Sequence, residues 1–208
     1  MGRPRSVRCV DRHDWDARYA GTDLVWSAEP NRFVAAELAD LAPGRALDLA
    51  AGEGRNAIWL AMRGWRVTAV DFSAVALDKA ARLAAKQRVT IECVEADVTT
   101  YEPEPGGYDL VLVAYLQTPA ADRAAWLAHA VAGLAPGATL LIVCHDRSNL
   151  EHGYGGPQDA AVLTTPEEVA AALDDLEVEK AELVERTVDT PDGPRIAIDH
   201  LVRAHRTR

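Results

Sequence analysis

The 208-residue chain lacks most features that mark secreted, membrane-bound or metal-stabilised proteins. Its three cysteines, Cys9, Cys93 and Cys144, lie far apart and belong to no CxxC or His/Cys cluster, so neither disulfides nor a structural zinc are expected. No hydrophobic run is long enough to span a membrane. The N-terminal "MGRPRSVRCVDRHD" has no apolar stretch of the signal-peptide kind, and residues 1–9 are expected to form a flexible tail. These absences predict a cytoplasmic protein.

Positive charge is also scarce. Lysine and arginine number 22 against 32 aspartates and glutamates, which leaves a formal net charge of −10. Such a chain has no bulk attraction for nucleic acid or an anionic membrane, so we expect a small-molecule partner and neither of those two. The hydrophobic fraction of 49% and the length suit a single globular domain. The oligomeric state is left open.

Strand-like and helix-like segments alternate from residue 45 onward. Strands are expected at 45–50, 65–71, 89–97, 108–115 and 138–145, and helices at 54–64, 74–87 and 121–134. This alternation predicts a doubly wound α/β fold, with a mostly parallel sheet covered by helices on both faces. Two short helices, at about 13–20 and 31–41, are expected before the sheet.

The last third of the chain departs from this alternation. Residues 146–161 are irregular and rich in glycine. The stretch "TPEE" from Thr165 combines an N-cap residue, a proline at the first helical position and two acids, so it predicts a helix that runs to about residue 175. The segments 176–188 and 194–206, joined by "DTPDGP", predict a terminal β-hairpin.

The turn after the first expected strand matches G-x-G-x-x-A from Gly52 to Ala57, a pattern that often binds a dinucleotide. The match alone is not specific. Asp48 at the strand end and Glu53 inside the turn would put negative charge near a bound diphosphate. A ligand with an ammonium group and no phosphate fits better, and S-adenosylmethionine is such a ligand.

Two further acids end the next two strands. Asp71 lies 71 − 48 = 23 residues after Asp48, near the spacing of roughly 20 at which an acid binds ribose hydroxyls. Asp97 ends the third strand, where it would accept a hydrogen bond from an adenine amino group beside the Val98 N–H. Each acid alone is more often a solvated loop residue or a cap, whereas three at successive strand ends indicate one ligand crevice.

The segments "DLAAGEGRN", "VTAVDFS" and "VEADV" resemble the cofactor motifs of class I S-adenosylmethionine-dependent methyltransferases. The resemblance covers residues 45–203. It implies a Rossmann-like core with strand order 3-2-1-4-5-7-6 and strand 7 antiparallel, S-adenosylmethionine as cofactor and S-adenosylhomocysteine as product. The family motif begins D-x-G-x-G-x-G, and Ala50 replaces its first glycine. The expected cofactor-binding residues are Asp48, Ala50, Gly52, Arg55, Asn56, Asp71, Phe72, Asp97, Val98 and Tyr115.

A narrower resemblance joins "WDARYAGTDLVWSAEPNRFV" and "GYGGPQDAAVLTTPEEV" to small bacterial methyltransferases related to the tellurite-resistance and thiopurine-type enzymes. In those enzymes the segment before the first strand, here the helical cap at residues 10–44, closes over the cofactor. The resemblance implies a small-molecule acceptor, often one with a sulfur, selenium or tellurium nucleophile.

Two strand-end residues are candidates for the chemistry. Methyl transfer requires donor and acceptor in line, with a general base only where the acceptor loses a proton. Tyr115 lies beside the expected methyl position, and His145 is the candidate base. Packing of Tyr115 at the strand end, and a loop-start hydrogen bond for His145, are the competing interpretations. Trp26, His152 and Tyr154 complete the predicted substrate pocket, and no metal site is expected.

The sequence therefore favours S-adenosylmethionine-dependent methyl transfer to a small molecule. A nicotinamide-dependent oxidoreductase is the first alternative, and it would require the dinucleotide that Glu53 opposes. A non-catalytic S-adenosylmethionine-binding protein is the second, because no single catalytic residue is obligatory for methyl transfer. Acidic net charge disfavours a macromolecular acceptor.

Overall fold

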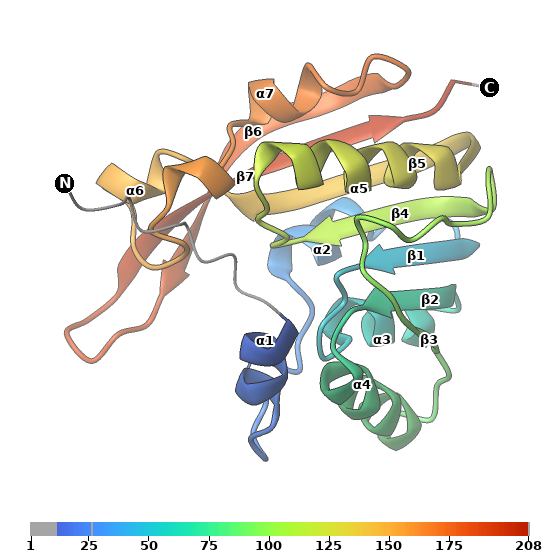
Figure 1. Ribbon diagram of the computed structural model, residues 1–208, viewed down its shortest axis with the longest axis horizontal. Helices are drawn as coiled ribbons and strands as arrows, with labels where there is room; N and C mark the ends of the chain where they lie inside the picture. The colour runs from blue at the N-terminus through green and yellow to red at the C-terminus, as the bar shows by residue number, and fades with distance from the viewer. Residues whose placement is uncertain (1–11, 26, 208) are drawn as a thin grey trace, which may run out of the picture.

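The computed structural model describes residues 12–25 and 27–207, which are built around one seven-stranded sheet (Figure 1). The strand order is β3-β2-β1-β4-β5-β7-β6, and β7 runs antiparallel to β5. The doubly wound α/β fold, its strand order and its antiparallel last strand are thus confirmed. The predicted tail at residues 1–9 and the predicted pocket residue Trp26 lie outside the described residues.

The secondary structure follows the predicted order. The strands are β1 (Arg45–Leu49), β2 (Arg66–Asp71), β3 (Glu92–Glu95), β4 (Tyr108–Ala114), β5 (Leu134–His145), β6 (Glu177–Val188) and β7 (Arg195–His205). The helices are α1 (Arg12–Tyr19), α2 (Arg32–Glu37), α3 (Arg55–Met62), α4 (Ala74–Lys86), α5 (Ala120–Gly133), α6 (Asn149–His152) and α7 (Pro166–Ala170), with a 3-10 helix η1 (Ala160–Val162). No helix in the described part of the chain is long and apolar enough to cross a membrane.

Two apolar layers sandwich the sheet. On one face, α5 and α7 pack against strand residues such as Leu140 and Ile142, and Trp126 is buried there as a core residue. On the other face, α2, α3 and α4 pack against Leu141 and Val143. Neighbouring residues of β5 alternate between the two layers, as strand geometry requires. The central strands are therefore held on both faces, and their carboxyl ends form a rigid platform.

Four elements differ from the sequence prediction by three residues or more. α2 ends at Glu37 rather than near residue 41, and β3 covers only Glu92–Glu95 of the predicted 89–97. α7 ends at Ala170 rather than near residue 175, and the chain continues in hydrogen-bonded turns. β5 begins at Leu134, directly after α5, and so contains Pro136, which the sequence pattern places after the helix end. The pairing of β5 with β4 shifts register at this point, which opens the ladder where a proline cannot donate.

The predicted terminal hairpin is present and extends beyond the sheet. β7 pairs with β5 only from Asp199 to His205, whereas its pairing with β6 begins at Arg195. The part of the hairpin that does not pair with β5 projects on the same side of the molecule as α1. The carboxyl ends of β1 and β4 lie on this side too (Figure 1). The hairpin and α1 thus flank the sheet edge at which ligands of parallel α/β folds bind.

Candidate functional site

β1 runs into a tight turn with three left-handed residues. Ala50, Gly52 and Gly54 have φ angles of 58°, 55° and 76°. A Cβ added at Gly52 would lie 2.9 Å from the Tyr19 hydroxyl, so the turn has no room for a side chain there. Ala50 adopts the backbone that a glycine would take more easily, at a cost of about 1–2 kcal/mol. The substitution in the motif thus keeps the shape of the turn.

Two buried carboxylates stand at this turn. Asp71 accepts hydrogen bonds from the Gly52 N–H at 2.8 Å and the Ser73 N–H at 2.9 Å. Asp48 Oδ2 has no hydrogen-bond partner among the described residues. Burial, together with the charge of Asp71, raises the pKa of Asp48 to about 7. A cationic ligand group such as an ammonium would satisfy this oxygen and favour the ionised carboxylate.

Glu53 has a different role from the one its position in the turn indicates. Its carboxylate pairs with Lys79 Nζ at 3.0 Å and accepts a hydrogen bond from the Val25 N–H at 2.9 Å. These contacts tie the segment after α1 and the helix α4 to the turn. The interpretation that Glu53 opposes a diphosphate is therefore wrong, because its charge is neutralised in an ion pair. Of these two acids, only Asp48 still counts against a bound diphosphate.

The end of β3 is more open than the ends of β1 and β2. Asp97 is exposed, and its Oδ1 accepts hydrogen bonds from the Thr99 N–H at 2.8 Å and the Thr99 hydroxyl at 2.7 Å. It thus stabilises the turn that follows, which was the competing interpretation for each acid. Val98 is buried, and Phe72 after β2 is half-buried. A contact of these residues with adenine stays a prediction.

A hydrogen-bonded cluster joins the ends of β4 and β5 to β7. The fully buried Asp199 accepts a bond from the Tyr115 hydroxyl on Oδ2 at 2.6 Å, and His145 Nδ1 lies 2.9 Å from its Oδ1. Arg186 of β6 donates through Nε to Oδ2 at 2.7 Å. The structure therefore brings together the two predicted catalytic residues, through a carboxylate that the sequence analysis did not single out.

The charges in this cluster define the hydrogen-bonding state of each member. Burial alone would raise the pKa of Asp199, but the hydrogen bonds of His145 and Tyr115 and the charge of Arg186 lower it. Burial and the charge of Asp199 raise the pKa of Tyr115, so its hydroxyl stays a donor. An ionised Asp199 requires a proton on His145 Nδ1, which leaves Nε2 as the acceptor of the neutral ring.

Tyr115 also connects the cluster to the glycine turn. It has a φ angle of 60°, and its ring lies 4.8 Å from the His145 ring between centroids. Asn31, the N-cap of α2, donates through Nδ2 to the Tyr115 hydroxyl at 3.2 Å and through its N–H to Asn56 Oδ1 at 2.9 Å. The Arg55 guanidinium lies 6.0 Å from the centroid of the Tyr115 ring. Tyr115 is therefore a bonded member of the site as well as a packing residue.

The other predicted pocket residues lie apart from this cluster. His152 and Tyr154 are exposed, and no hydrogen bond in the described part of the chain joins either to Asp199. Their loop approaches the cluster through Gly156 instead, where an added Cβ would lie 3.1 Å from the His145 ring. The role of both side chains in the pocket stays a prediction.

Asp199, Arg186 and Asn31 are the site residues that sequence reasoning missed. Asp199 carries a signal, because an acid in the apolar strand "RIAIDHLV" requires a partner when it is buried. Asp146, the sequence neighbour of His145, does not orient its ring. It lies on the opposite face of the sheet, with its Oδ2 3.7 Å from His200 Nδ1.

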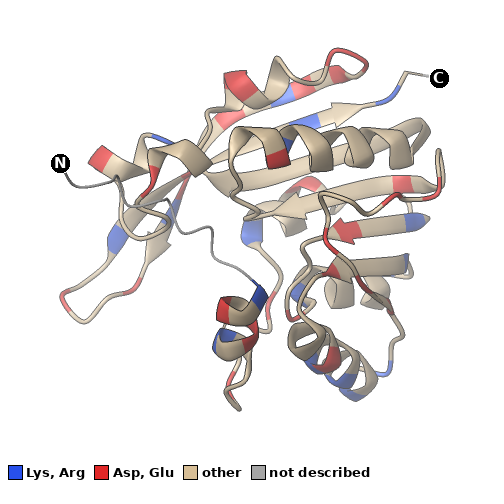
Figure 2. Ribbon diagram, viewed as in Figure 1, with Lys and Arg blue, Asp and Glu red and all other residues tan. Residues whose placement is uncertain are grey.

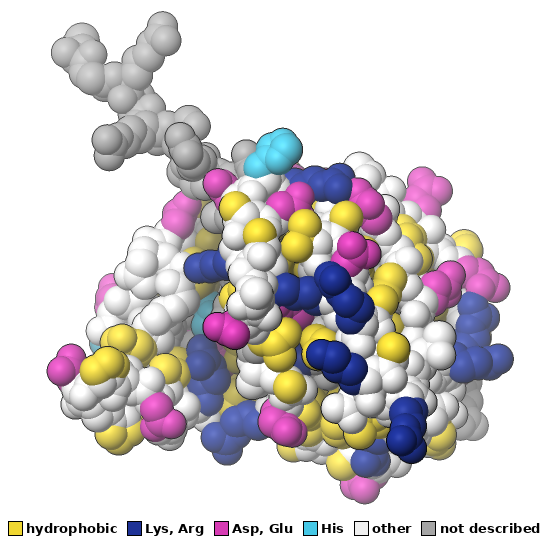
Figure 3. All heavy atoms as spheres, turned by 90° about the horizontal axis from the view of Figure 1, so that it is seen from below, with side chains coloured by type: hydrophobic (Ala, Val, Ile, Leu, Met, Phe, Trp, Pro, Cys, Tyr) yellow, Lys and Arg dark blue, Asp and Glu magenta, His cyan; other side chains and the backbone are white. Residues whose placement is uncertain are grey.

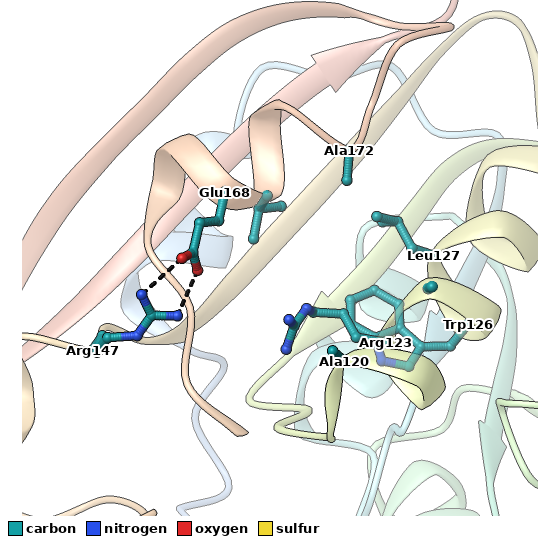
Figure 4. Close-up of a pocket in the computed structure, with 9 residues that line it drawn as sticks. Ala120, Arg123, Trp126, Leu127, Arg147, Glu168 and Ala172 are labelled. Carbon is teal, nitrogen blue, oxygen red and sulfur yellow. Dashed lines mark hydrogen bonds and ion pairs between the residues drawn. The ribbon is translucent and has the colours of Figure 1, made fainter. Parts of the chain in front are cut away.

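A separate hollow of about 320 Å³ lies between α5 and α7 (Figure 4). Its lining includes Trp126, Leu127 and Arg123, and the ion pair in which both terminal nitrogens of Arg147 donate to Glu168 at 2.7 Å. This hollow belongs to the apolar layer opposite His145 and contains none of the predicted site residues. The residues gathered at the carboxyl ends of the strands are therefore the candidate site.

Comparison with known proteins agrees with this geometry. Residues 46–137 match a family model described as a methyltransferase domain. This stretch, which is less than half of the chain, is therefore similar to a methyltransferase domain. A curated relative of the chain is the demethylmenaquinone methyltransferase of Clavibacter sepedonicus, 38% identical over 96 residues. The matched segment spans 46% of this chain and only 37% of the relative.

Solved structures share the fold of this chain over nearly its whole length. The N-methyltransferase NodS from Bradyrhizobium japonicum, in complex with S-adenosylhomocysteine, covers 95% of this chain and 98% of its own with a TM-score of 0.70 and 18% identity. TehB from Haemophilus influenzae covers 95% of this chain and 67% of its own with a TM-score of 0.68 and 17% identity. Sequence identities this low show a common fold, but they do not show that the proteins share a methyl acceptor.

The residues at the ends of β1 and β2 fit S-adenosylmethionine. The unpartnered oxygen of Asp48 suits an ammonium group, and the Asp71 carboxylate, bonded to backbone N–H groups, keeps at least one lone pair for a ribose hydroxyl. Gly52 and Gly54 give the turn its left-handed backbone, which a residue with a side chain adopts less easily. A diphosphate would meet the buried Asp48, so both the family match and this carboxylate count against the nicotinamide alternative.

Proposed function

We propose that this protein transfers a methyl group from S-adenosylmethionine to a small-molecule acceptor, and that His145 takes the acceptor's proton. The observation that carries the base assignment is the 2.9 Å contact of His145 Nδ1 with Asp199 Oδ1. When bound, S-adenosylmethionine supplies an electrophilic methyl carbon, whose bond to sulfur breaks as the acceptor atom bonds to it, so that S-adenosylhomocysteine remains.

The residues around His145 have separable tasks in this proposal. Asp199 holds the imidazole ring with Nε2 free and stabilises the imidazolium that forms when Nε2 takes the proton. Tyr115 shapes the acceptor side, and its hydroxyl and Arg186 hold Asp199 ionised. Asp48 and Asp71 bind the amino-acid and ribose parts of the cofactor. The remaining predicted cofactor contacts are Ala50, Gly52, Arg55, Asn56, Phe72, Asp97 and Val98.

A positioned base favours an acceptor whose nucleophilic atom is protonated at neutral pH. Amines, phenols and weakly acidic thiols meet this condition, whereas a preformed anion such as selenite or tellurite needs no base. The relatives carry the names of an N-methyltransferase and a demethylmenaquinone methyltransferase, which supports a small acceptor without selecting one class. A cytoplasmic location, and the absence of nucleic-acid and membrane partners, stay predictions.

Two measurements test the proposed function. Calorimetry with S-adenosylhomocysteine and with NAD should detect the first ligand only, and binding of NAD alone would overturn the cofactor assignment. Release of S-adenosylhomocysteine is then followed with thiols, selenite, tellurite, halides, phenols and amines. Turnover with a protic acceptor that is lost in His145→Gln and kept in His13→Gln, an exposed histidine of α1, supports the base. No turnover with any acceptor would favour the non-catalytic alternative.

A further inference from the structure

Two guanidinium groups lie at the ring of Tyr115. The Cζ atom of Arg55, from the start of α3, is 6.0 Å from the ring centroid, and that of Arg186, from β6, is 5.6 Å away. Burial lowers the pKa of Arg55, and the charge of Arg186 lowers it further. The two cations are thus close enough to repel each other at the acceptor side of the site.

Neither guanidinium has its hydrogen-bonding capacity filled. Arg55 forms no hydrogen bond or ion pair within the described residues, although the charge of Asp48 acts on it. Arg186 donates to Asp199 through Nε and also interacts with the Tyr115 hydroxyl, and the five N–H groups of its guanidinium exceed these two partners. A guanidinium group has several N–H donors, and leaving them unpaired in a partly buried site costs free energy.

Positive charge also exceeds negative charge around Tyr115. Asp199 is one carboxylate for the two guanidinium groups, and Asp48 is only partly ionised near neutral pH. Figure 3 shows lysine, arginine and histidine side chains in a hollow between the hairpin and the body of the molecule. Asp189 and Asp192 lie in the turn between β6 and β7, whereas the glutamates of β6 lie along the strand, and Figure 2 shows acidic residues at the tip of the hairpin. The excess positive charge at Tyr115 therefore suits a negatively charged ligand.

We infer that the methyl acceptor is an anion whose carboxylate is bound by Arg186 together with Arg55, on the ring of Tyr115. The inference rests on the proposed function and narrows its acceptor class. A planar carboxylate matches the paired N–H groups of a guanidinium. The carboxylate of the cofactor shares this chemistry and is the other source that Arg55 alone could bind. Arg186 comes from the hairpin and is not among the predicted cofactor contacts. A substitution of Arg186 therefore distinguishes the carboxylate of the acceptor from that of the cofactor.

The test compares two acceptors that share a thiol and differ in charge, 3-mercaptopropionate and 3-mercaptopropionamide. With the full-length protein we expect kcat/KM to favour the acid by about tenfold or more. Arg186→Gln should remove this preference, and Arg186→Lys should keep part of it. Arg195→Gln, an exposed arginine of the same hairpin, should keep all of it. Because both thiols depend equally on His145 and Asp199, the ratio is insensitive to a general loss of activity.

Each result decides the inference. An acid-to-amide ratio that is unchanged in Arg186→Gln, or a wild-type preference for the amide, would overturn it. S-adenosylhomocysteine affinity, measured by calorimetry, should be unchanged in Arg186→Gln, because Arg186 is not among the predicted cofactor contacts. Weaker S-adenosylhomocysteine binding in Arg55→Gln, with the preference for the acid intact, would assign Arg55 to the cofactor's carboxylate. It would then overturn the inference that Arg55 binds the acceptor.

The anion site is also measured without turnover. With S-adenosylhomocysteine bound, the acid should bind the protein about tenfold tighter than the amide, and Arg186→Gln should abolish the difference. If neither thiol is methylated, the proposed acceptor chemistry fails while this binding difference still supports the anion site. Equal binding of acid and amide contradicts the anion site, whatever the turnover.

Discussion

His145 Nδ1 lies 2.9 Å from Asp199 Oδ1, and the two residues stand directly opposite each other in the antiparallel pairing of β5 with β7. Their side chains therefore project from the same face of the sheet. Asp199 is fully buried and ionised, so it fixes both the orientation and the tautomer of the imidazole. The candidate base is thus positioned by a strand that follows it by about fifty residues.

Asp199→Asn should lower kcat by about 10²-fold or more, because the amide no longer stabilises an imidazolium at His145. Affinity for S-adenosylhomocysteine should stay within about threefold of wild type, since Asp199 does not line the glycine turn. Steady-state kinetics and calorimetry measure the two effects. The pH profile of kcat should lose the limb that reports the base. A variant with an unchanged pH profile would reduce Asp199 to a structural residue.

Tyr115→Phe should lower the free energy of unfolding by about 1–3 kcal/mol, because a hydrogen bond to a buried, charged carboxylate is lost. The ring is retained, so cofactor affinity should change little. Urea unfolding measures the stability change, and Tyr154→Phe, whose side chain is exposed, is the matched control and should be neutral. Equal stability of the two variants would contradict the bond between Tyr115 and Asp199.

Asp48→Asn should stabilise the ligand-free protein at alkaline pH. The folded pKa of Asp48 is raised to about 7, so its contribution to stability is full below the unfolded value of about 3.9 and is lost as pH rises through 7. Asparagine has no such loss. The advantage of the variant in urea unfolding should grow by about 2–3 kcal/mol between pH 5 and pH 8. A constant difference in the free energy of unfolding across this pH range would show that the pKa of Asp48 is not raised.

The same variant should bind the cofactor product more weakly. An ammonium group favours the ionised form of Asp48, so wild-type affinity for S-adenosylhomocysteine should rise with pH through about 7 as fewer protons must be released. Asp48→Asn should lack this pH dependence. Calorimetry in buffers of different ionisation enthalpy measures the proton released. Parallel pH curves for the two proteins would rule out a contact between Asp48 and the ammonium.

Lys79→Met should destabilise the protein by about 3 kcal/mol, because it removes the ion pair between Lys79 and the buried Glu53 carboxylate. The double variant Glu53→Gln, Lys79→Met should be more stable than Lys79→Met alone, since the carboxylate that Lys79 neutralises is then uncharged. Urea unfolding of the four proteins in this cycle measures the coupling. Additive effects of the two substitutions would contradict the ion pair.

Local chemistry explains what could be predicted. Ser73 accepts a hydrogen bond from the Ala76 N–H and caps α4, and Thr165 forms a capping box with Glu168, so helix starts follow from neighbouring residues. The strands follow from short apolar runs. Helix ends are less determined, and α7 is shorter than its composition indicates. The residues after Ala170 form hydrogen-bonded turns instead, and these turns bury Leu173 in the same apolar layer as Leu127 of α5.

The sequence by itself determined the alternation of strands and helices, the positive-φ turn after β1 and the acids at the ends of β1 and β2. Each of these depends on residues within a few positions of one another. Only the tertiary structure decided that Lys79 neutralises Glu53, and that Asp199 and Arg186 complete the site of Tyr115 and His145. These partners are set by β7 inserting between β5 and β6, and a pairing register across the sheet leaves no signal in neighbouring residues.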